Sequence, residues 1–108
     1  MAERDPRLSG PTLKVLKVFL DAPREQRSGA AISREVKIGS GTLYPLLARL
    51  EQAGWLASEW EAVDPSVAGR PRRRYYALTA LGRDKARAAF DELQLSGFGL
   101  IPWMPWLR

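Results

Sequence analysis

The sequence predicts a mainly α-helical protein with a small β-hairpin, and three observations lead to this fold class. The stretch "GTLYPLLARLEQAG" places leucines at the i, i+3, i+4, i+7 spacing of one helix face, at Leu43, Leu46, Leu47 and Leu50. Similar apolar stripes occur before and after it. Two runs typical of strands, "WLASEWEAV" and "RRYYALT", flank a segment that contains Pro and Gly. A chain of 108 residues has room for one modest core.

Two helices are expected before that stretch. The first begins near Ser9 and Pro11, which together form a helix-start signal, and it ends at "DAP". Its apolar stripe consists of Leu13, Leu16, Phe19 and Leu20. A polar loop separates it from a shorter second helix in "AAISREV". We expect Ser28 to cap this second helix, with Ile32 and Val36 on its buried face.

The segment "KIGSG", residues 37–41, is expected to form a tight turn before the third helix. In this turn Ile38 should point inward, and Gly39 should provide the permissive backbone. The second helix, the turn and the third helix together form a helix-turn-helix pattern.

The third helix can start at Ser40 or at Thr42. We favour Thr42 as the cap. Pro45 then occupies the third helical position, where its missing N–H breaks no intrahelical hydrogen bond.

A β-hairpin is expected after the third helix, which Gly54 ends. Its strands lie in residues 55–63 and 73–79. The connection "DPSVAGRPR" is too long for a two-residue turn and is expected to be a mobile loop. Thr79 then caps a fourth helix over residues 80–94.

Composition narrows the class of function. The net charge of +5 and a pI near 10.1 make a polyanion a leading candidate partner. Cysteine and histidine are absent, which excludes disulfides, the usual zinc ligands and imidazole-based triads. We therefore expect no enzyme, no cofactor and no metal site, since Asp64, Asp84 and Asp91 lack a paired base. No apolar run approaches the ~18 residues of a membrane span, and the chain is expected to be cytoplasmic.

Three helices followed by a hairpin is the order of elements in a winged helix, which lays its third helix in the DNA major groove. The outer face of that helix carries small and polar residues. We expect Thr42 and Tyr44 to touch phosphate and bases, and Arg49 to reach a phosphate or a guanine. The alternative is a helix that only packs, with Tyr44 half-buried.

The stretch "GRPRRR" places four arginines within five positions of the hairpin connection. Strand alternation sends Arg72 and Arg74 to one face and Arg73 to the other. Such a wing should lie against phosphates or in the minor groove and make binding strongly salt-dependent. The alternative is a solvated hairpin tip. The predicted DNA-binding residues are Lys37, Ser40, Thr42, Tyr44, Pro45, Arg49, Arg70, Arg72, Arg73 and Arg74.

Two blocks, "GTLYPLLARLEQAGWLASEWE" and "GRPRRRYYALTALG", resemble the PadR family of bacterial transcription regulators. Typical members have a GTLYP-type recognition helix, an RLE-x-x-G exit and a basic wing that runs into a YY-x-LT-x-x-G ending. The resemblance is close over residues 41–82 and looser over the first two helices. It implies a homodimeric winged-helix binder of double-stranded DNA, commonly a repressor released by a small molecule. Dimerisation would use the C-terminal helix and the first helix.

The chain is accordingly divided into a winged helix-turn-helix DNA-binding domain, residues 1–79, and a C-terminal dimerisation helix with an aromatic tail, residues 80–108. The tail departs from the family pattern, as do Ala30 and Ala31, where members often carry an aromatic residue. We expect the tail either to pack across the dimer seam or to line a pocket for a flat aromatic effector. The predicted dimer or effector residues are Ala86, Ala89, Phe90, Leu93, Phe98, Trp103 and Trp106.

Two rival hypotheses remain. A winged-helix regulator of the MarR or ArsR kind would keep DNA binding with a different dimer geometry, and the YY-x-LT ending argues against it. A winged helix that serves only as a protein-interaction module would dock on a larger partner. The arginine-rich wing argues against that, because interface cores tend to exclude charge.

Overall fold

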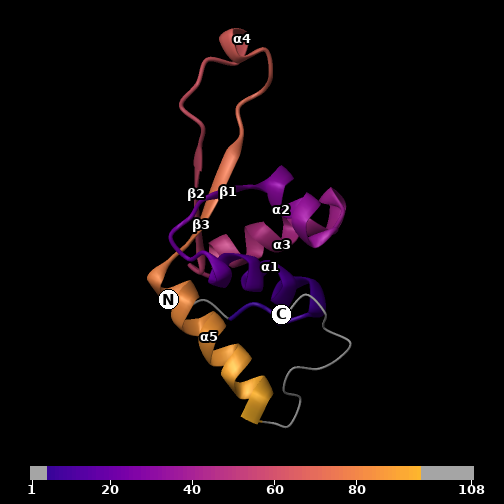
Figure 1. The fold of residues 1–108 in the computed structure, drawn as a ribbon, viewed down its shortest axis with the longest axis vertical. Helices are drawn as coiled ribbons and strands as arrows, with labels where there is room; N and C mark the ends of the chain where they lie inside the picture. The colour runs from indigo at the N-terminus through magenta and orange to yellow at the C-terminus, as the bar shows by residue number, and fades with distance from the viewer. Residues whose placement is uncertain (1–4, 96–108) are drawn as a thin grey trace.

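The computed structural model describes residues 5–95 and shows a winged helix with a long hairpin and a protruding last helix (Figure 1). The hairpin of β2 (Leu56–Trp60) and β3 (Arg74–Leu78) rises from the helical body and carries α4 (Pro65–Ala68) at its tip, while α5 (Ala80–Leu95) points away at the opposite end (Figure 1). The predicted fold class is confirmed. The elements in chain order are α1 (Gly10–Asp21), β1 (Arg27–Ser28), α2 (Gly29–Val36), α3 (Ser40–Gln52), β2 (Leu56–Trp60), α4 (Pro65–Ala68), β3 (Arg74–Leu78) and α5 (Ala80–Leu95).

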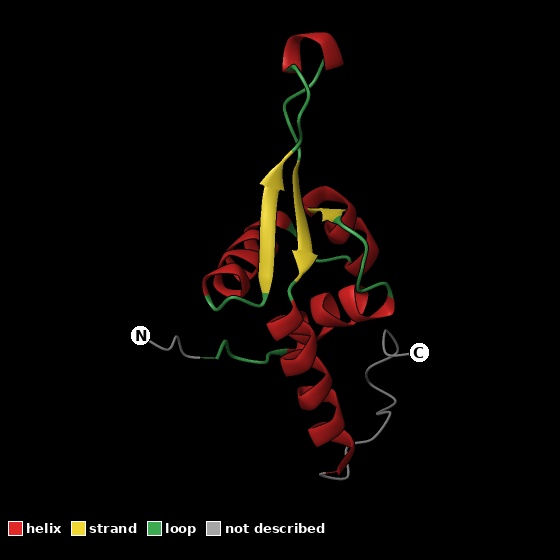
Figure 2. Ribbon diagram, turned by 90° about the vertical axis from the view of Figure 1, so that its left-hand side faces the viewer, coloured by secondary structure: helices red, strands yellow, loops and turns green. Residues whose placement is uncertain are grey.

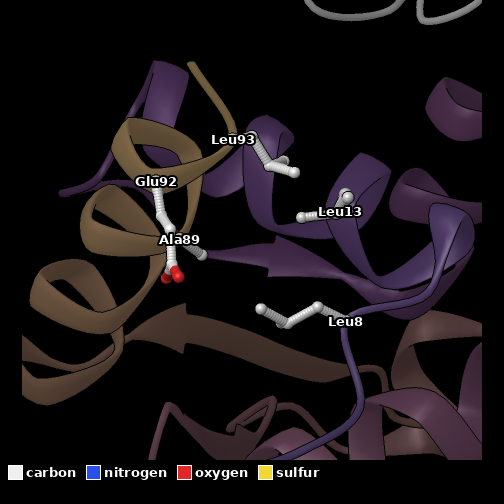
Figure 3. A pocket seen from close by; sticks show the side chains of 5 residues that line it. All are labelled: Leu8, Leu13, Ala89, Glu92 and Leu93. Carbon is white, nitrogen blue, oxygen red and sulfur yellow. The ribbon is translucent and has the colours of Figure 1, made fainter. Parts of the chain in front are cut away.

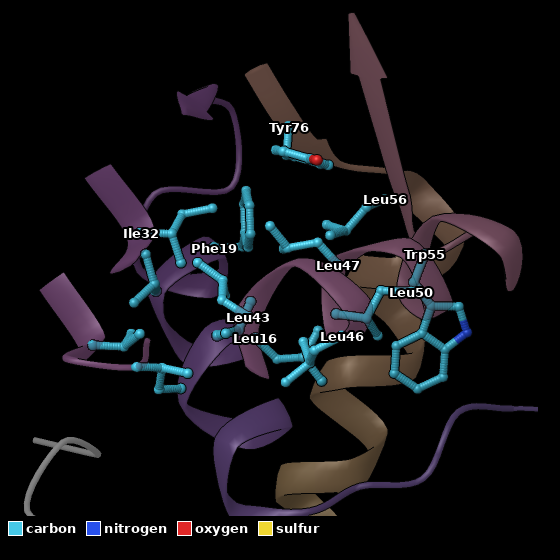
Figure 4. Packing of buried hydrophobic residues seen from close by; sticks show 14 of the residues in the cluster. Leu16, Phe19, Ile32, Leu43, Leu46, Leu47, Leu50, Trp55, Leu56 and Tyr76 are labelled. Atoms are coloured by element: carbon cyan, nitrogen blue, oxygen red, sulfur yellow. The ribbon is translucent and has the colours of Figure 1, made fainter. Parts of the chain in front are cut away.

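The core lies where α1, α2 and α3 meet the base of the sheet (Figure 4). All four leucines of the α3 stripe are buried, and so are Phe19 of α1 and Ile32 of α2. Trp55 closes the cluster beside α5. Each such side chain contributes ~1.5–3 kcal/mol when fully buried, so the apolar stripes supply most of the drive to fold. The stripes predicted from helical spacing are confirmed, with Leu20 only partly buried.

Three helix caps agree with the sequence predictions. The hydroxyl of Ser9 accepts the N–H of Thr12 at 3.4 Å, and that of Ser28 accepts the N–H of Ala31 at 3.1 Å. The hydroxyl of Thr79 accepts the N–H of Gly82 at 2.9 Å, three residues on. Each hydroxyl satisfies an N–H that the first helical turn leaves without a partner.

The predicted cap of α3 is wrong. The helix begins at Ser40, with Gly39 as its N-cap residue and no capping side chain. The N–H of Thr42 donates to the carbonyl of Gly39 at 3.1 Å, so Thr42 already belongs to the first turn. Pro45 therefore lies inside the helix and removes the bond to the carbonyl of Gly41. The buried leucines of α3 outweigh the loss of one backbone hydrogen bond.

The left-handed residue of the turn is Lys37, which corrects the expectation for Gly39. Lys37 has φ 58° and ψ 42°, whereas Gly39 has φ −66° and ψ 155°. Ile38 follows directly and is buried, so the chain must reverse two residues earlier than predicted. The hydroxyl of Ser33 donates to the carbonyl of Ile38 at 2.7 Å and holds this turn. The burial of Ile38 offsets the ~1–2 kcal/mol that a left-handed non-glycine residue costs.

The sheet has three antiparallel strands in the order β1-β3-β2 (Figure 2). Strands β2 and β3 confirm the predicted hairpin, with Ser58 opposite Tyr76 and Trp60 opposite Arg74. Strand β1 falls in a segment predicted to be a loop. Its two residues are too few for an alternating pattern to reveal. It connects the start of α2 to the sheet, because Arg27 pairs with Tyr76.

The hairpin connection contains a turn of helix, α4, where a loop was expected. The carboxylate of Asp64 caps it by accepting the N–H and the hydroxyl of Ser66, at 2.9 and 2.8 Å. These hydrogen bonds lower the pKa of Asp64. Pro65 starts the turn, and Gly69 ends it at φ 71°.

A single residue, Thr79, separates β3 from α5. Its N–H donates to the carbonyl of Trp55 at 3.0 Å, and its hydroxyl lies 2.6 Å from the carbonyl oxygen of Gly54. These contacts join the start of α5 to the end of α3. In the described part of the chain, no helix is long and apolar enough to cross a membrane. The predicted tail residues Phe98, Trp103 and Trp106 lie outside the described residues.

Candidate nucleic-acid interface

The face of α3 opposite the core is open to solvent. The buried leucines occupy one side of the helix, and small or polar side chains occupy the other. A helix with such a face is suited to enter the major groove of B-DNA, which is about 12 Å wide. The exposed residues of α3 are Ser40, Gly41, Thr42, Tyr44, Pro45, Ala48, Arg49 and Gln52.

Tyr44 lies at the edge of this face and is 43% exposed. Its ring rests against Gly29, at the start of α2. Tyr44 therefore combines two properties. One side of its ring packs against the protein, as expected of a structural residue, and the rest is exposed, as expected of a residue that contacts bases.

Two cations lie on α3 and in the turn before it. Lys37 and Arg49 are both exposed, and neither side chain makes an ion pair or hydrogen bond within residues 5–95. Their charges are not neutralised locally, so they remain available to an external anion.

The wing differs from the sequence expectation, because two of its four arginines are paired with glutamates. Arg70 holds Glu61 with two hydrogen bonds, Nη1 to Oε1 at 2.6 Å and Nη2 to Oε2 at 2.9 Å. These bonds are the main reason why the pKa of Glu61 falls to about 2. The pair closes the wing below α4, and the charge of Arg70 is largely neutralised.

Arg74 begins β3, at the end of the strand pairing nearest the hairpin tip, and its side chain takes part in a network with α3. Its Nε donates to the hydroxyl of Ser58 at 2.9 Å, and its Nη2 lies 3.4 Å from Oε1 of Glu51. The Ser58 hydroxyl in turn donates to Glu51 at 2.6 Å. The guanidinium also lies over the ring of Trp60, 5.2 Å from its centroid. Arg74 thus connects both strands of the wing to the last turn of α3.

Arg72 and Arg73 are the two wing arginines without a carboxylate in ion-pair contact in the described chain. Arg72 donates from Nε to the carbonyl of Val63 at 2.8 Å, and Arg73 donates its backbone N–H to Glu61 at 3.2 Å. Both side chains are exposed. The expected strand alternation does not apply to them, because β3 begins only at Arg74.

Sequence reasoning missed the acidic residues that decide which arginines are available. Glu61 lies nine residues before Arg70, and Glu51 lies 23 residues before Arg74. Packing of α3 against β2 brings Glu51 to Arg74, and the hairpin connection brings Glu61 to Arg70. Even the exact strand register would not have revealed these pairs, because neither glutamate lies among the paired residues of β2 and β3.

A groove of about 200 Å³ lies between α1 and α5 (Figure 3). Ala89 and Leu93, two of the predicted dimer residues, face it from α5. Ala86 instead belongs to the core of its own chain, and Phe90 packs partly against that core. The lining residues are Leu8, Leu13, Ala89, Glu92 and Leu93.

Comparison with known proteins identifies the family. Residues 25–88 match the "Transcriptional regulator PadR-like family". The chain belongs to the PadR family. The match covers β1, α2, α3, the whole wing and the first half of α5. The family predicted from the two sequence blocks is thus confirmed. "Transcriptional regulator Rv3488" of Mycobacterium tuberculosis is 38% identical, over 72% of this chain and 76% of that protein.

Solved structures agree with the PadR assignment. A PadR family transcriptional regulator from Eggerthella lenta has a TM-score of 0.66 and 27% identity, over 88% of this chain and 85% of that one. Overoxidized AbfR bound to DNA has a TM-score of 0.67 and 25% identity, over 82% of this chain and 60% of that one. The zinc-responsive MarR family member ZitR of Lactococcus lactis, at 20% identity and a TM-score of 0.60, shares the fold. It covers 91% of this PadR chain and 63% of its own.

Proposed function

We propose that this PadR regulator binds a pseudo-palindromic DNA operator as a homodimer and represses transcription. The observation that carries the proposal is the open, small-sided face of α3, with the unpaired cations Lys37 and Arg49 beside it. AbfR, a protein of similar fold, has been solved bound to DNA, which supports DNA binding as the function of this chain.

In this proposal α3 enters the major groove with its N-terminal turn foremost. Ser40 and Thr42 meet phosphates or base edges there, Pro45 lies along the groove wall, and Tyr44 and Arg49 supply base contacts. The wing places Arg72 and Arg73 against the flanking phosphates or the minor groove.

The dimer forms through residues 80–108 and α1 in this proposal. The groove between α1 and α5 is apolar over most of its lining, and Leu8 at its rim is 41% exposed. A second copy placed across a two-fold axis would cover this surface and present two α3 helices to one side of the DNA. Release by a flat aromatic effector stays a prediction.

Titration and footprinting on duplex DNA from upstream of the protein's own gene test the DNA-binding proposal. We expect two protected major-groove segments about one turn, ~10 bp, apart. Arg49→Ala should weaken binding, whereas Arg87→Ala, an exposed charge on α5 outside the lining of the groove between α1 and α5, should not. Protection of one asymmetric half-site, or no protection at any salt concentration, would contradict the proposal.

Sedimentation of two neighbouring variants tests the dimer. Ala89 lines the groove, whereas Ala88 is exposed outside its lining. Ala89→Glu should place a charge in the apolar seam, give a monomer and lose operator affinity. Ala88→Glu makes the same chemical change and should remain dimeric. Equal masses for the two variants would move the interface elsewhere.

A further inference from the structure

Gly29 is the first residue of α2, and it is buried although it starts a short helix. Among the glycines of the described chain, only Gly54 and Gly69 have positive φ, so the backbone at position 29 does not require glycine. Glycine is also less favourable than alanine in a helix. The reason for a glycine here must therefore be the space around it.

That space is taken by the ring of Tyr44. A Cβ on Gly29 would lie 2.6 Å from both Cε1 and the hydroxyl oxygen of Tyr44, and 2.8 Å from its Cζ. Carbon atoms in contact normally lie ~3.5–4.0 Å apart. Any side chain at position 29 would thus force the ring of Tyr44 to a different orientation.

Gly10 provides a matched comparison within the same chain. It is the first residue of α1 and follows a serine N-cap, as Gly29 does. A Cβ on Gly10 would meet nothing within 4 Å. Replacing each glycine by alanine therefore makes the same change in helix propensity and cap geometry, and only one replacement touches α3.

We propose that Gly29 is a specificity-determining residue, because the absence of a side chain there leaves room for the Tyr44 ring in the orientation that contacts DNA bases. Gly29 is a positioning residue, since it acts through Tyr44 and need not touch DNA. The inference rests on the proposed function. It adds that the start of α2, on the other side of the helix-turn-helix, sets the base preference of α3.

The test uses a random-sequence duplex library to select a preferred site with the wild-type protein. Binding is then measured on that duplex and on single-base substitutions of it, for Gly29→Ala, Tyr44→Ala, the double variant and Gly10→Ala. Gly29→Ala should lower discrimination about tenfold at the base positions that Tyr44→Ala affects. In the Tyr44→Ala background, Gly29→Ala should add less than about twofold, since the two changes share one cause. Gly10→Ala should keep wild-type preference.

A second measurement reports the position of the Tyr44 ring directly. With ¹³C-labelled tyrosine, the ring resonances of Tyr44 should shift in Gly29→Ala and stay in place in Gly10→Ala. If Gly29→Ala fails to fold, recovery of the fold in the Gly29→Ala/Tyr44→Ala double variant supports the contact between position 29 and the Tyr44 ring. Failure to recover overturns the inference.

The outcomes separate the inference from the function beneath it. Wild-type preference in Gly29→Ala or in Tyr44→Ala overturns the inference and leaves DNA binding intact. A wild-type protein that selects no duplex overturns the proposed function, and the inference with it.

Discussion

Gly82 packs so closely against Trp55 that an added Cβ would lie 2.0 Å from the Trp55 carbonyl oxygen. The same oxygen accepts the N–H of Thr79 at 3.0 Å. The first turn of α5 therefore lies directly on the backbone that leads into β2. The glycine that ends "YYALTALG" is required by this backbone contact and not by its own φ.

Gly82→Ala should destabilise the protein, because backbone atoms cannot move aside as a flexible side chain can. Forced overpacking of this kind typically costs ~1–3 kcal/mol, which lowers the melting temperature of a domain of this size by several degrees. Calorimetry of Gly82→Ala and Gly10→Ala checks this. The Gly10 variant should melt at or slightly above the wild-type temperature, and equal melting of both variants would show that α5 can shift freely.

The pKa of Glu61 is lowered from 4.5 to about 2, chiefly by the Arg70 hydrogen bonds. Because the folded-state pKa is depressed, the stabilisation is complete above pH ~4.5 and is lost as the pH falls through about 2. NMR titration of the Glu61 carboxyl should give a midpoint near 2, and Arg70→Gln should raise it toward 4.5. A wild-type midpoint near 4.5 would mean that the pair does not form in solution.

Arg72 and Arg73 should supply the salt-dependent part of wing binding. Each phosphate contact contributes about one unit to the slope of log K against log salt. The double variant Arg72→Ala/Arg73→Ala should flatten the slope by about two units, whereas Arg87→Ala, which removes one exposed charge from α5, should leave it unchanged. An unchanged slope in the double variant would remove the wing from the interface.

Arg74 should act by holding the wing, which a lysine cannot do. Arg74→Lys keeps the charge but loses the planar geometry that reaches Ser58 and Glu51 together. We expect faster amide hydrogen exchange in β2 and β3 and weaker DNA binding. Arg72→Lys should change neither. Normal exchange and affinity in Arg74→Lys would instead make Arg74 a simple phosphate contact.

Much of the fold could be predicted, because it rests on local signals. The leucine spacing of α3 and the serines before α1 and α2 each act within a few residues of sequence. The errors occurred where distant contacts decide the outcome. Burial of Ile38 moves the turn to Lys37, and buried leucines hold Pro45 inside a helix that local rules would start later.

The candidate site was predictable in place but not in detail. The exposed face of α3 follows from the helical period alone. The state of each wing arginine depends on Glu51 in α3 and on Glu61 in the hairpin connection, which come near the arginines only in the folded chain. The tip helix α4 has a local signal in Asp64 and Pro65, an acidic cap before a first-turn proline, but an Asp-Pro pair is equally typical of a loop.

The single-residue junction at Thr79 leaves no flexible linker between the wing, which we propose to contact DNA, and α5, which we propose to meet a second copy. In a dimer built this way, the distance between the two wings is set by the angle at which the two copies of α5 cross. An operator whose half-sites were one base pair too far apart would be rejected by geometry alone, whatever its bases. Any molecule that changes this crossing angle would change the affinity for DNA without contacting the DNA.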